Sequence, residues 1–323
     1  MYQTMLKPEL LRELTLDTRA HPQHRPWLSA ASGLVCTGTV AYVVADDELS
    51  LGCFPFARPW SKQLQQAPVQ LLPVLAGELP LDHKLRKQAK PDLECLLLLP
   101  CSTEFPHGAL LALGSGSNPN RCRALLLALN ANGELTDQRH VFDLSEFYAP
   151  LHNHFDEPNI EGMFLDGTQL RLLQRGNKGH NQSACISYDF SEFLDWTLKH
   201  RHDPPAILAV LPLNFGSVEG VPLCPTDAVS LPEGGWVASL VAEDTDSSYH
   251  DGRCVGSALA VMDTNDRLSE LHMLANSPKV VGLALLSNAK NSPIELLMVT
   301  DADDPALPAQ LLRVTMQVSK TIG

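Results

Sequence analysis

The sequence predicts an all-β fold, namely a β-propeller that forms one domain over residues 1–323. Five times along the chain, a short apolar strand begins with a polar or tightly turned residue, in a repeating register. We take the equivalent positions to be Ser32, Glu94, Glu161, Asp227 and Val281. Their spacings of 62, 67, 66 and 54 residues are somewhat longer than the period of about 40–50 residues typical of four-stranded propeller blades. The 24 prolines and 20 glycines suit a β protein with many loops.

Four predicted blades each contain four apolar runs bounded by Gly, Pro, Asn or Asp, which is the pattern of short strands. The first blade comprises residues 34–36, 40–45, 49–54 and 69–75. The second comprises residues 93–99, 109–113, 124–129 and 134–142. The third comprises residues 160–165, 170–174, 184–190 and 206–213. The fourth comprises residues 227–231, 236–241, 257–262 and 268–274.

The fifth blade has only three strands near the end of the chain, at 280–286, 294–299 and 311–318. The leucine-rich run 10–16 is otherwise unassigned, and we expect it to supply the fourth strand. Pairing it there would close the ring and remove the free sheet edges that favour aggregation. We therefore expect five four-stranded blades, with a six-bladed ring as the alternative. Residues 144–148 and 190–198 are expected to form short helical turns between strands.

Composition and charge exclude several functional classes. The formal net charge is −13, which disfavours binding to nucleic acid or to an anionic membrane, because such binding depends on basic residues. The basic run at 84–90 is expected to be a solvated loop. The chain shows no secretory pattern and no run of about 18 apolar residues. Eight cysteines without a Cys-x-x-Cys pair are expected to be structural, in a reduced, cytoplasmic protein.

Polar residues gather at one end of the predicted blades. Neighbouring strands are antiparallel, so the start of an innermost strand lies at the same face as the end of the next strand. The starts carry Ser32, Asp92, Glu94, Asn159, Glu161, Asp227 and Lys279. The ends carry Asp46, Asp47, the turn at 114–117, Arg175, Asn177, Glu243, Asp244, Asp301 and Asp303. We expect both sets to converge at one mouth of the central channel.

Crowded carboxylates cannot all stay ionised without compensating charge. A divalent cation would supply it, and oxygen ligands favour Ca²⁺ or Mg²⁺ over zinc. The expected metal ligands are Glu94, Glu161, Asp227 and Asn159. The residues expected to bind a small anionic substrate are Arg121, Arg175, Lys279 and Glu243, since arginine binds anions in a bidentate manner. The alternative is a structural network of hydrogen bonds and ion pairs that holds the blades together.

Three other segments have simpler interpretations. The glycine-rich segment 114–121 lacks the end of a phosphate-binding loop and is expected to be a tight turn. His152 and His154 precede a proline and are expected in a surface loop. The acidic segment 243–252 does not fit the calcium-binding loop of an EF-hand, and is expected either to cover the mouth as a solvated loop or to contact a ligand.

Several motifs carry a resemblance that covers nearly the whole chain. They lie at 90–94, 114–117 with Arg121, 158–162, 174–177, 226–228, 243–245 and 300–305. On these motifs the chain resembles a family of uncharacterised bacterial β-propeller proteins. More distantly, its blades look like those of phytase-like esterases and of calcium-dependent lactonases and gluconolactonases. In those propellers a Glu-Gly near the start of an inner strand supplies a metal ligand, a pattern from which Val281 departs.

These observations support two functional hypotheses. The first is a metal-dependent hydrolase of a small anionic ester, phosphoester or lactone, in which Glu94 or Asp227 accepts a proton from water. The chain has no Gly-x-Ser-x-Gly motif, which disfavours a serine nucleophile of the α/β-hydrolase type. The second hypothesis is a propeller without catalytic activity that binds a ligand or a protein partner, since a fold alone does not establish function.

Overall fold

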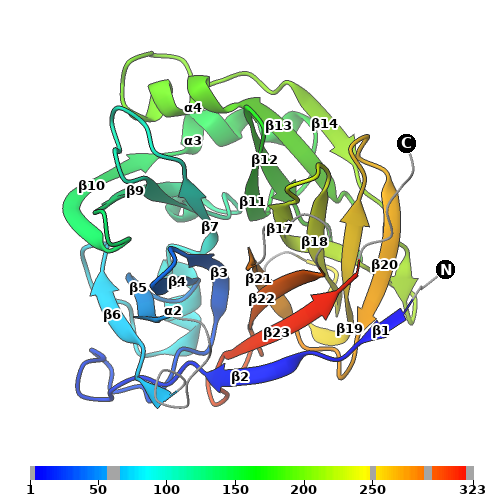
Figure 1. Ribbon diagram of the computed structural model, residues 1–323, viewed down its shortest axis with the longest axis horizontal. Helices are drawn as coiled ribbons and strands as arrows, with labels where there is room; N and C mark the ends of the chain where they lie inside the picture. Colours follow the sequence, from blue (N-terminus) through cyan, green and yellow to red (C-terminus); the bar gives the residue numbers. More distant parts are fainter. Residues whose placement is uncertain (1–3, 57–65, 248–251, 287–292, 318–323) are drawn as a thin grey trace.

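The computed structural model describes residues 4–56, 66–247, 252–286 and 293–317. Five antiparallel sheets are arranged in a ring (Figure 1), which makes the molecule a five-bladed β-propeller. The innermost strands, nearest the centre of the ring, are β3 (Ala31–Cys36), β7 (Leu93–Leu99), β11 (Ile160–Asp166), β17 (Cys224–Ser230) and β21 (Val280–Leu285). The prediction of five blades is confirmed, and the six-bladed alternative is wrong.

The first three blades follow the order of the chain. Blade 1 continues from β3 with β4 (Val40–Ala45), β5 (Ser50–Pro55) and β6 (Gln70–Pro73). Blade 2 continues from β7 with β8 (Ala109–Gly114), β9 (Arg123–Leu129) and β10 (Leu135–Asp143). Blade 3 continues from β11 with β12 (Gln169–Gln174), β13 (Ala184–Asp189) and β14 (Ala209–Pro212). A small hairpin of β15 (Ser217–Val218) and β16 (Val221–Pro222) leads into blade 4.

The last two blades take strands from the start of the chain. Blade 4 continues from β17 with β18 (Trp236–Asp244), β19 (Arg253–Met262) and β20 (Leu268–Leu274), to which β1 (Thr4–Leu6) is added in parallel. Blade 5 continues from β21 with β22 (Ile294–Thr300), β23 (Gln310–Met316) and finally β2 (Glu9–Glu13). Because β2 pairs with β23, the N-terminal segment closes the ring as predicted.

Short helices connect some of the strands. They are α2 (His83–Ala89), α3 (Ser145–Tyr148), α4 (Phe190–Thr197) and the 3₁₀ turns η1 (Pro119–Arg121) and η2 (Ala149–Asn153). The predicted helical turns at 144–148 and 190–198 correspond to α3 and α4. The solvated loop predicted at 84–90 is wrong, because residues 84–89 lie in α2. No helix in the described part of the chain is long and apolar enough to cross a membrane.

The hydrophobic core consists of five clusters, and each joins the facing surfaces of two neighbouring blades. Leu111 of blade 2 and Leu172 of blade 3, for example, belong to the same cluster. The other four clusters join the remaining pairs of neighbours around the ring. Burial of apolar surface therefore holds every blade against two others.

Every innermost strand contains a one-residue β-bulge near its start. The unpaired residues are Ser32, Glu94, Glu161, Thr226 and Val281. The repeat predicted from the sequence is therefore right in four blades and wrong by one residue in blade 4, where Thr226, not Asp227, is equivalent. A bulge redirects the side chain that it carries, and in four blades, at Ser32, Glu94, Glu161 and Val281, the bulge residue lies at the mouth of the channel.

Candidate functional site

Three positions in each blade build the mouth of the channel. The first is the bulge residue, and the second lies two residues before it, at Ala30, Asp92, Asn159, Cys224 and Lys279. The third directly follows the second strand in four blades, at Asp46, Ser115, Arg175 and Asp301. In blade 4 its equivalent is Val241, which lies inside β18 and pairs with Cys224. In four blades the amide N–H of the third position donates to the carbonyl of the second, for example Arg175 to Asn159 at 2.9 Å and Asp46 to Ala30 at 3.1 Å.

These positions surround a cavity of about 60 Å³. At each of the three positions, the residues of four blades line this cavity. A buried water needs about 10–15 Å³ of such space, so the cavity can hold a few waters, an ion or a small ligand. Its acidic lining residues are Asp46, Asp92, Glu94, Glu161, Glu243, Asp301 and Asp303. Its basic lining residues are Lys87, Lys90, Arg121, Arg175 and Lys279. Seven acids and five bases leave a surplus of two negative charges among the described lining residues.

Lys90 joins the two blades on one side of the cavity. Its Nζ contacts Asp46 of blade 1 and lies 2.8 Å from Oδ1 of Asp92 in blade 2. Burial alone would lower the pKa of Lys90, but the two aspartates and Glu94 outweigh it and hold that pKa well above its usual value. Lys90 is therefore a permanent positive charge at the mouth.

Asp92 is fixed by several donors. Oδ2 accepts from Ser115 Oγ at 2.5 Å and from Arg121 Nη1 at 2.8 Å. Burial would raise the pKa of Asp92, but Lys90 and Arg121 together lower it below its usual value. The backbone of Asp92 has a φ of 55°, a left-handed conformation that is costly outside glycine and clusters at functional sites. Such a residue is held in place by its surroundings.

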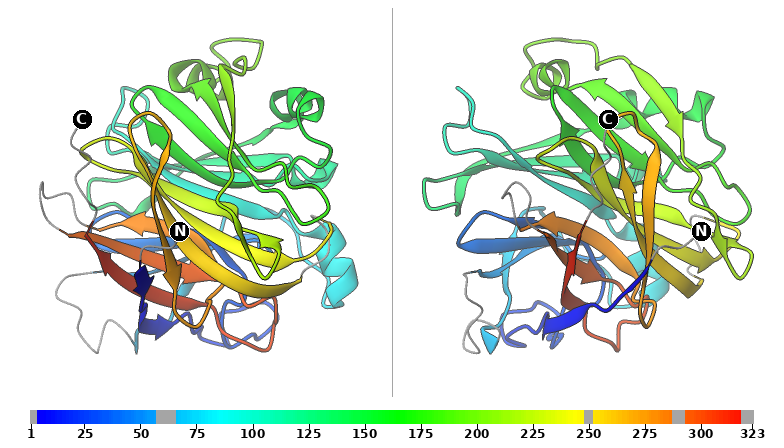
Figure 2. Two further views of the ribbon diagram at one scale, coloured as in Figure 1. Left: turned by 90° about the vertical axis from the view of Figure 1, so that its right-hand side faces the viewer. Right: turned by 45° about the vertical axis from the view of Figure 1, so that its right-hand side comes forward.

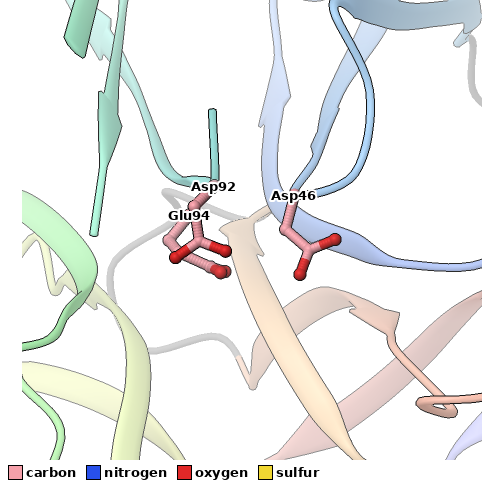
Figure 3. A group of neighbouring side chains, drawn as sticks. All are labelled: Asp46, Asp92 and Glu94. Atoms are coloured by element: carbon pink, nitrogen blue, oxygen red, sulfur yellow. The ribbon is translucent and has the colours of Figure 1, made fainter. Parts of the chain in front are cut away.

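Glu94 is the least compensated carboxyl of this group. Carboxylate oxygens of Asp46, Asp92 and Glu94 lie within 4.8 Å of one another, an arrangement that can hold a metal ion. Figure 3 shows the three side chains approaching one space from two blades. In the described part of the chain, ion pairs reach Asp46 and Asp92 but not Glu94. Burial, followed by repulsion from Glu161, Asp92 and Asp46, raises the pKa of Glu94 well above its usual value.

Asp46 also holds its proton more tightly than usual. Burial raises its pKa to about 7 against the opposing effect of Lys90, with smaller contributions from Asp47 and Asp92 in the same direction as burial. On blade 5, burial likewise raises the pKa of Asp301 well above its usual value, despite Lys279. Protonation of these carboxyls is one way to remove the negative surplus, and uptake of a cation is the other.

A second network crosses the cavity from blade 3 to blade 5. Arg175 lies 3.4 Å from Oε1 of Glu161 and also contacts Glu243, and Lys279 Nζ lies 3.3 Å from Oε2 of Glu243. Burial would raise the pKa of Glu243, but Arg175 and Lys279 lower it to about 2. Lys279 further contacts Asp303 at 2.5 Å. Asn159 Nδ2 donates to Glu161 at 2.7 Å. The carboxylates of Glu161 in blade 3 and Glu243 in blade 4 are therefore both held by fixed donors.

Seven of the eight residues expected to bind a metal ion, transfer a proton or bind substrate line this cavity. They are Glu94, Asn159, Glu161, Arg121, Arg175, Lys279 and Glu243. Asp227 does not line it, because its carboxylate accepts from the amides of Ala228 at 2.9 Å and Leu283 at 2.8 Å, between blades 4 and 5. Burial raises the pKa of Asp227 well above its usual value. Asp227 is therefore not part of the site at the mouth.

Sequence reasoning missed the importance of Lys90, which was assigned to a solvated run. A signal existed, because Lys90 stands two residues before Asp92, and Pro91 between them restricts the backbone. The other weak signals have the simpler explanation. The segment 114–121 leaves β8 at Gly114 and ends in the 3₁₀ turn η1 (Pro119–Arg121), and His152 and His154 are exposed. Within the acidic segment at 243–252, Thr245 and Ser247 line the cavity, and residues 248–251 lie outside the described part.

Comparison with known proteins places most of the chain in one family. Residues 27–316 match the model described as a family of unknown function (DUF6929). No curated protein sequence matches the chain.

Similar solved structures include two glycosidases and a luciferin-regenerating enzyme. An α-L-arabinofuranosidase from Podospora anserina in complex with cellotriose is 12% identical, with a TM-score of 0.50 over 98% of this chain and 97% of that one. An exo-β-1,3-galactanase from Clostridium thermocellum is 12% identical, with a TM-score of 0.47 over 96% of this chain and 62% of that one. The luciferin-regenerating enzyme is 12% identical, with a TM-score of 0.40 over 91% and 94%. At this identity the arabinofuranosidase supports the fold alone.

Proposed function

We propose that this protein, which belongs to the DUF6929 family of unknown function, is a metal-dependent hydrolase that acts at the mouth of its central channel. The observation that carries the proposal is the cluster of Asp46, Asp92 and Glu94 within 4.8 Å of one another, in a cavity whose lining carries two surplus negative charges. One divalent cation would neutralise that surplus. The pKa values of Asp46 and Glu94 are raised, so without a cation these carboxyls tend to bind protons. The cation would take the place of those protons.

The donor chemistry fits Ca²⁺ or Mg²⁺, because both prefer carboxylate oxygens. Asp46, Asp92 and Glu94 would hold the cation, with Asn159 on the neighbouring blade. Lys90 is the competitor, since its ammonium group already contacts Asp46 and Asp92. A lysine side chain is flexible, so this ammonium group can move aside when a cation enters.

The substrate class follows from the size and the charges of the cavity. A volume of about 60 Å³ suits a small ester, phosphoester or lactone group rather than a long chain. When bound, a divalent cation polarises a carbonyl or phosphoryl oxygen. Arg175 and Lys279 line the cavity and would orient the anionic part of the substrate by charge-assisted hydrogen bonds.

Glu161 is the residue assigned to proton transfer. Asn159 and Arg175 hold its Oε1, so the carboxylate has a fixed position beside the cluster of Asp46, Asp92 and Glu94. A carboxylate within reach of a bound water can accept its proton as a general base. Glu94 then serves as a ligand, which separates the two roles that the sequence assigned to it.

The test is calorimetric titration with Ca²⁺ and Mg²⁺ in two buffers of different ionisation enthalpy at pH 7.5. We expect one site and release of protons, because Asp46 and Glu94 must lose protons to bind a cation. Glu94→Gln should weaken binding at least tenfold. Glu161→Gln should retain binding but lose turnover in a screen of small phosphoesters, esters and lactones. Glu233→Gln, at an exposed turn outside the cavity, is the control.

Lack of cation binding together with lack of turnover would favour the second candidate, a ligand-binding propeller without catalytic activity. One observation supports it: Lys90, Arg175 and Lys279 all form ion pairs with carboxylates of the mouth. In that case the same residues would form a fixed polar socket for a small ligand.

A further inference from the structure

Residues 84–89 of helix α2 pack against the propeller without a buried apolar side chain. Of residues 84–89, Arg86 alone is buried, and Leu85 is 54% exposed. Surface helices normally owe their stability to a buried apolar face, and a helix of this length is marginal without one. Figure 2 shows α2, in cyan, at one face of the ring. Its position must therefore depend on polar contacts.

Those contacts fall at two points along the helix. Arg86 donates to Glu48 at 3.0 Å, to Asp47 at 3.1 Å and to Gln23 at 2.8 Å, all on the side of blade 1. On the side of blade 2, Asn120 Nδ2 donates to the carbonyls of Gln88 at 3.1 Å and Lys90 at 3.0 Å.

The η1 turn adds a further contact at the C-terminal end of α2. Arg121 Nη2 donates to the carbonyl of Lys87 at 3.1 Å. The side chain of Lys90 then adds the ion pairs with Asp46 and Asp92. The C-terminal end of α2 is therefore held by the η1 turn and by the acidic cluster of the mouth.

This end of α2 separates two cavities. A second cavity, of about 70 Å³, lies beside the mouth and shares Asp46, Lys87, Lys90, Asp301 and Asp303 with it. Both lysines come from α2 or from the residue that directly follows it. Displacement of this end of the helix would remove part of the shared wall.

We propose that α2 is a gate, which opens as a unit when Lys90 leaves Asp46 and Asp92, and thereby joins the second cavity to the mouth and admits a small polar ligand. The ion pairs of Arg86 and Lys90 are largely buried, so their attraction is offset by a desolvation cost that opening to water would recover, and each hydrogen bond adds little net free energy. This helix therefore opens at a lower free energy than the blades, which are held together by buried apolar side chains. The expected effect of a bound cation on the gate rests on the proposed function. A cation bound at Asp46 and Asp92 competes with Lys90 and therefore favours the open gate.

The test combines amide hydrogen exchange with labelling of a cysteine inside the cavity. Cys224 lines the cavity and is only 3% exposed, whereas Cys101 is exposed and serves as an internal reference. Asn120→Ala removes two contacts of the helix, and Lys90→Met removes its ion pairs. Asn130→Ala is the matched control, because Asn130 also bonds to the backbone of blade 2 but not to α2.

In the wild type we expect residues 84–90 to exchange as a group and faster than β7 and β8. Both Asn120→Ala and Lys90→Met should raise that exchange, and the rate of Cys224 labelling relative to Cys101, at least tenfold. Saturating Ca²⁺ should act on the wild type in the same direction. Protection of α2 equal to that of β7 and β8, or variants that behave like Asn130→Ala, would overturn the gate.

Different experimental results would contradict the gate and the hydrolase. Calcium binding that leaves exchange of α2 unchanged would overturn the competition between the cation and Lys90 and leave the hydrolase proposal intact. Faster exchange and labelling in the two variants, without any cation binding, would support the gate and contradict the hydrolase.

Discussion

Glu94 shows how a single position can combine structure and chemistry. The β-bulge directs its side chain into the cavity, and the basic residues nearby pair with its neighbours. The pKa of Glu94 is raised because burial and repulsion from three neighbouring carboxyls both disfavour its charged form. The same surroundings that disfavour the ionised carboxyl would stabilise a cation bound to it.

The raised pKa values give a definite pH dependence. A carboxyl whose pKa is higher in the folded state binds more protons when folded, so the free energy of unfolding falls as pH rises through the interval between the two pKa values. For Asp46 that interval runs from the ordinary value near 4 to about 7. We therefore expect the protein without divalent cations to be less stable at pH 8 than at pH 5.

Glu94→Gln should reduce this difference, because glutamine resembles the protonated carboxyl. At pH 8, with a chelator present, we expect the variant to unfold at a higher temperature, by the equivalent of about 1–3 kcal/mol for relief of one buried uncompensated group. Thermal unfolding followed by circular dichroism at pH 5 and pH 8 measures both quantities. A variant less stable than the wild type at pH 8 would contradict this account of Glu94.

At the scale of the element, a glycine follows the bulge residue in three of the five blades. Gly33, Gly162 and Gly282 occupy this place in blades 1, 3 and 5. A Cβ added to Gly282 would lie 2.6 Å from the carbonyl oxygen of Ser32, and one added to Gly162 would lie 2.7 Å from Cα of Asp227. The neighbouring innermost strands therefore approach one another closely because glycine has no side chain.

Gly282→Ala should strain the contact between blades 5 and 1, because the opposing atoms belong to the backbone and cannot rotate away. We expect a loss of about 1–3 kcal/mol in the free energy of unfolding, the usual cost of overpacking. Unfolding by urea measures it. A variant as stable as the wild type would show that the innermost strands can move apart without cost.

The elements also show what the sequence could and could not predict. Alternating apolar runs located the strands, since this period follows directly from a sheet with one buried face. Helix α2 was missed because ion pairs made by Arg86 and Lys90, rather than apolar periodicity, hold it in place. In blade 4 the repeat was misaligned because a carboxyl at Asp227 imitated the pattern, whereas a bulge is defined by backbone pairing that places it at Thr226.

The candidate site was predictable to the same extent as the topology. Antiparallel strands bring the starts and ends of particular strands together, so Glu94, Glu161 and Arg175 could be assigned to one mouth before their contacts were known. The pairing of each acid with a particular base could not be predicted, because it depends on side-chain reach across blades. Lys90, which connects Asp46 with Asp92, is the clearest example.

For the whole molecule, the N-terminal segment fastens the ring at two blades. Strand β2 completes blade 5, and β1 pairs with β20 of blade 4. Within this segment Leu14 is fully buried in the cluster between blades 5 and 1, whereas Leu10 is 52% exposed. Closure of the ring therefore depends on a few buried side chains near the start of the chain.

Leu14→Ala should lower the free energy of unfolding by about 2–5 kcal/mol, the range for truncation of a buried leucine. Leu10→Ala, four residues earlier and exposed, is the control and should change stability by less than about 0.5 kcal/mol. Chemical denaturation of both variants measures the difference. Equal effects of the two substitutions would mean that burial at Leu14 does not stabilise the closed ring.

The repeated bulge has a consequence for how such a protein can diversify. The same bulge carries Ser32, Glu94, Glu161 and Val281, which line the cavity. It also carries Thr226, whose hydroxyl instead donates to the carbonyl of Val280. Each bulge residue that lines the cavity can therefore be substituted on its own without a change in the backbone that carries it. Introducing an acid at Ser32, or removing the acid at Glu161, would change the charge of the channel mouth by one unit and leave the surrounding backbone unchanged.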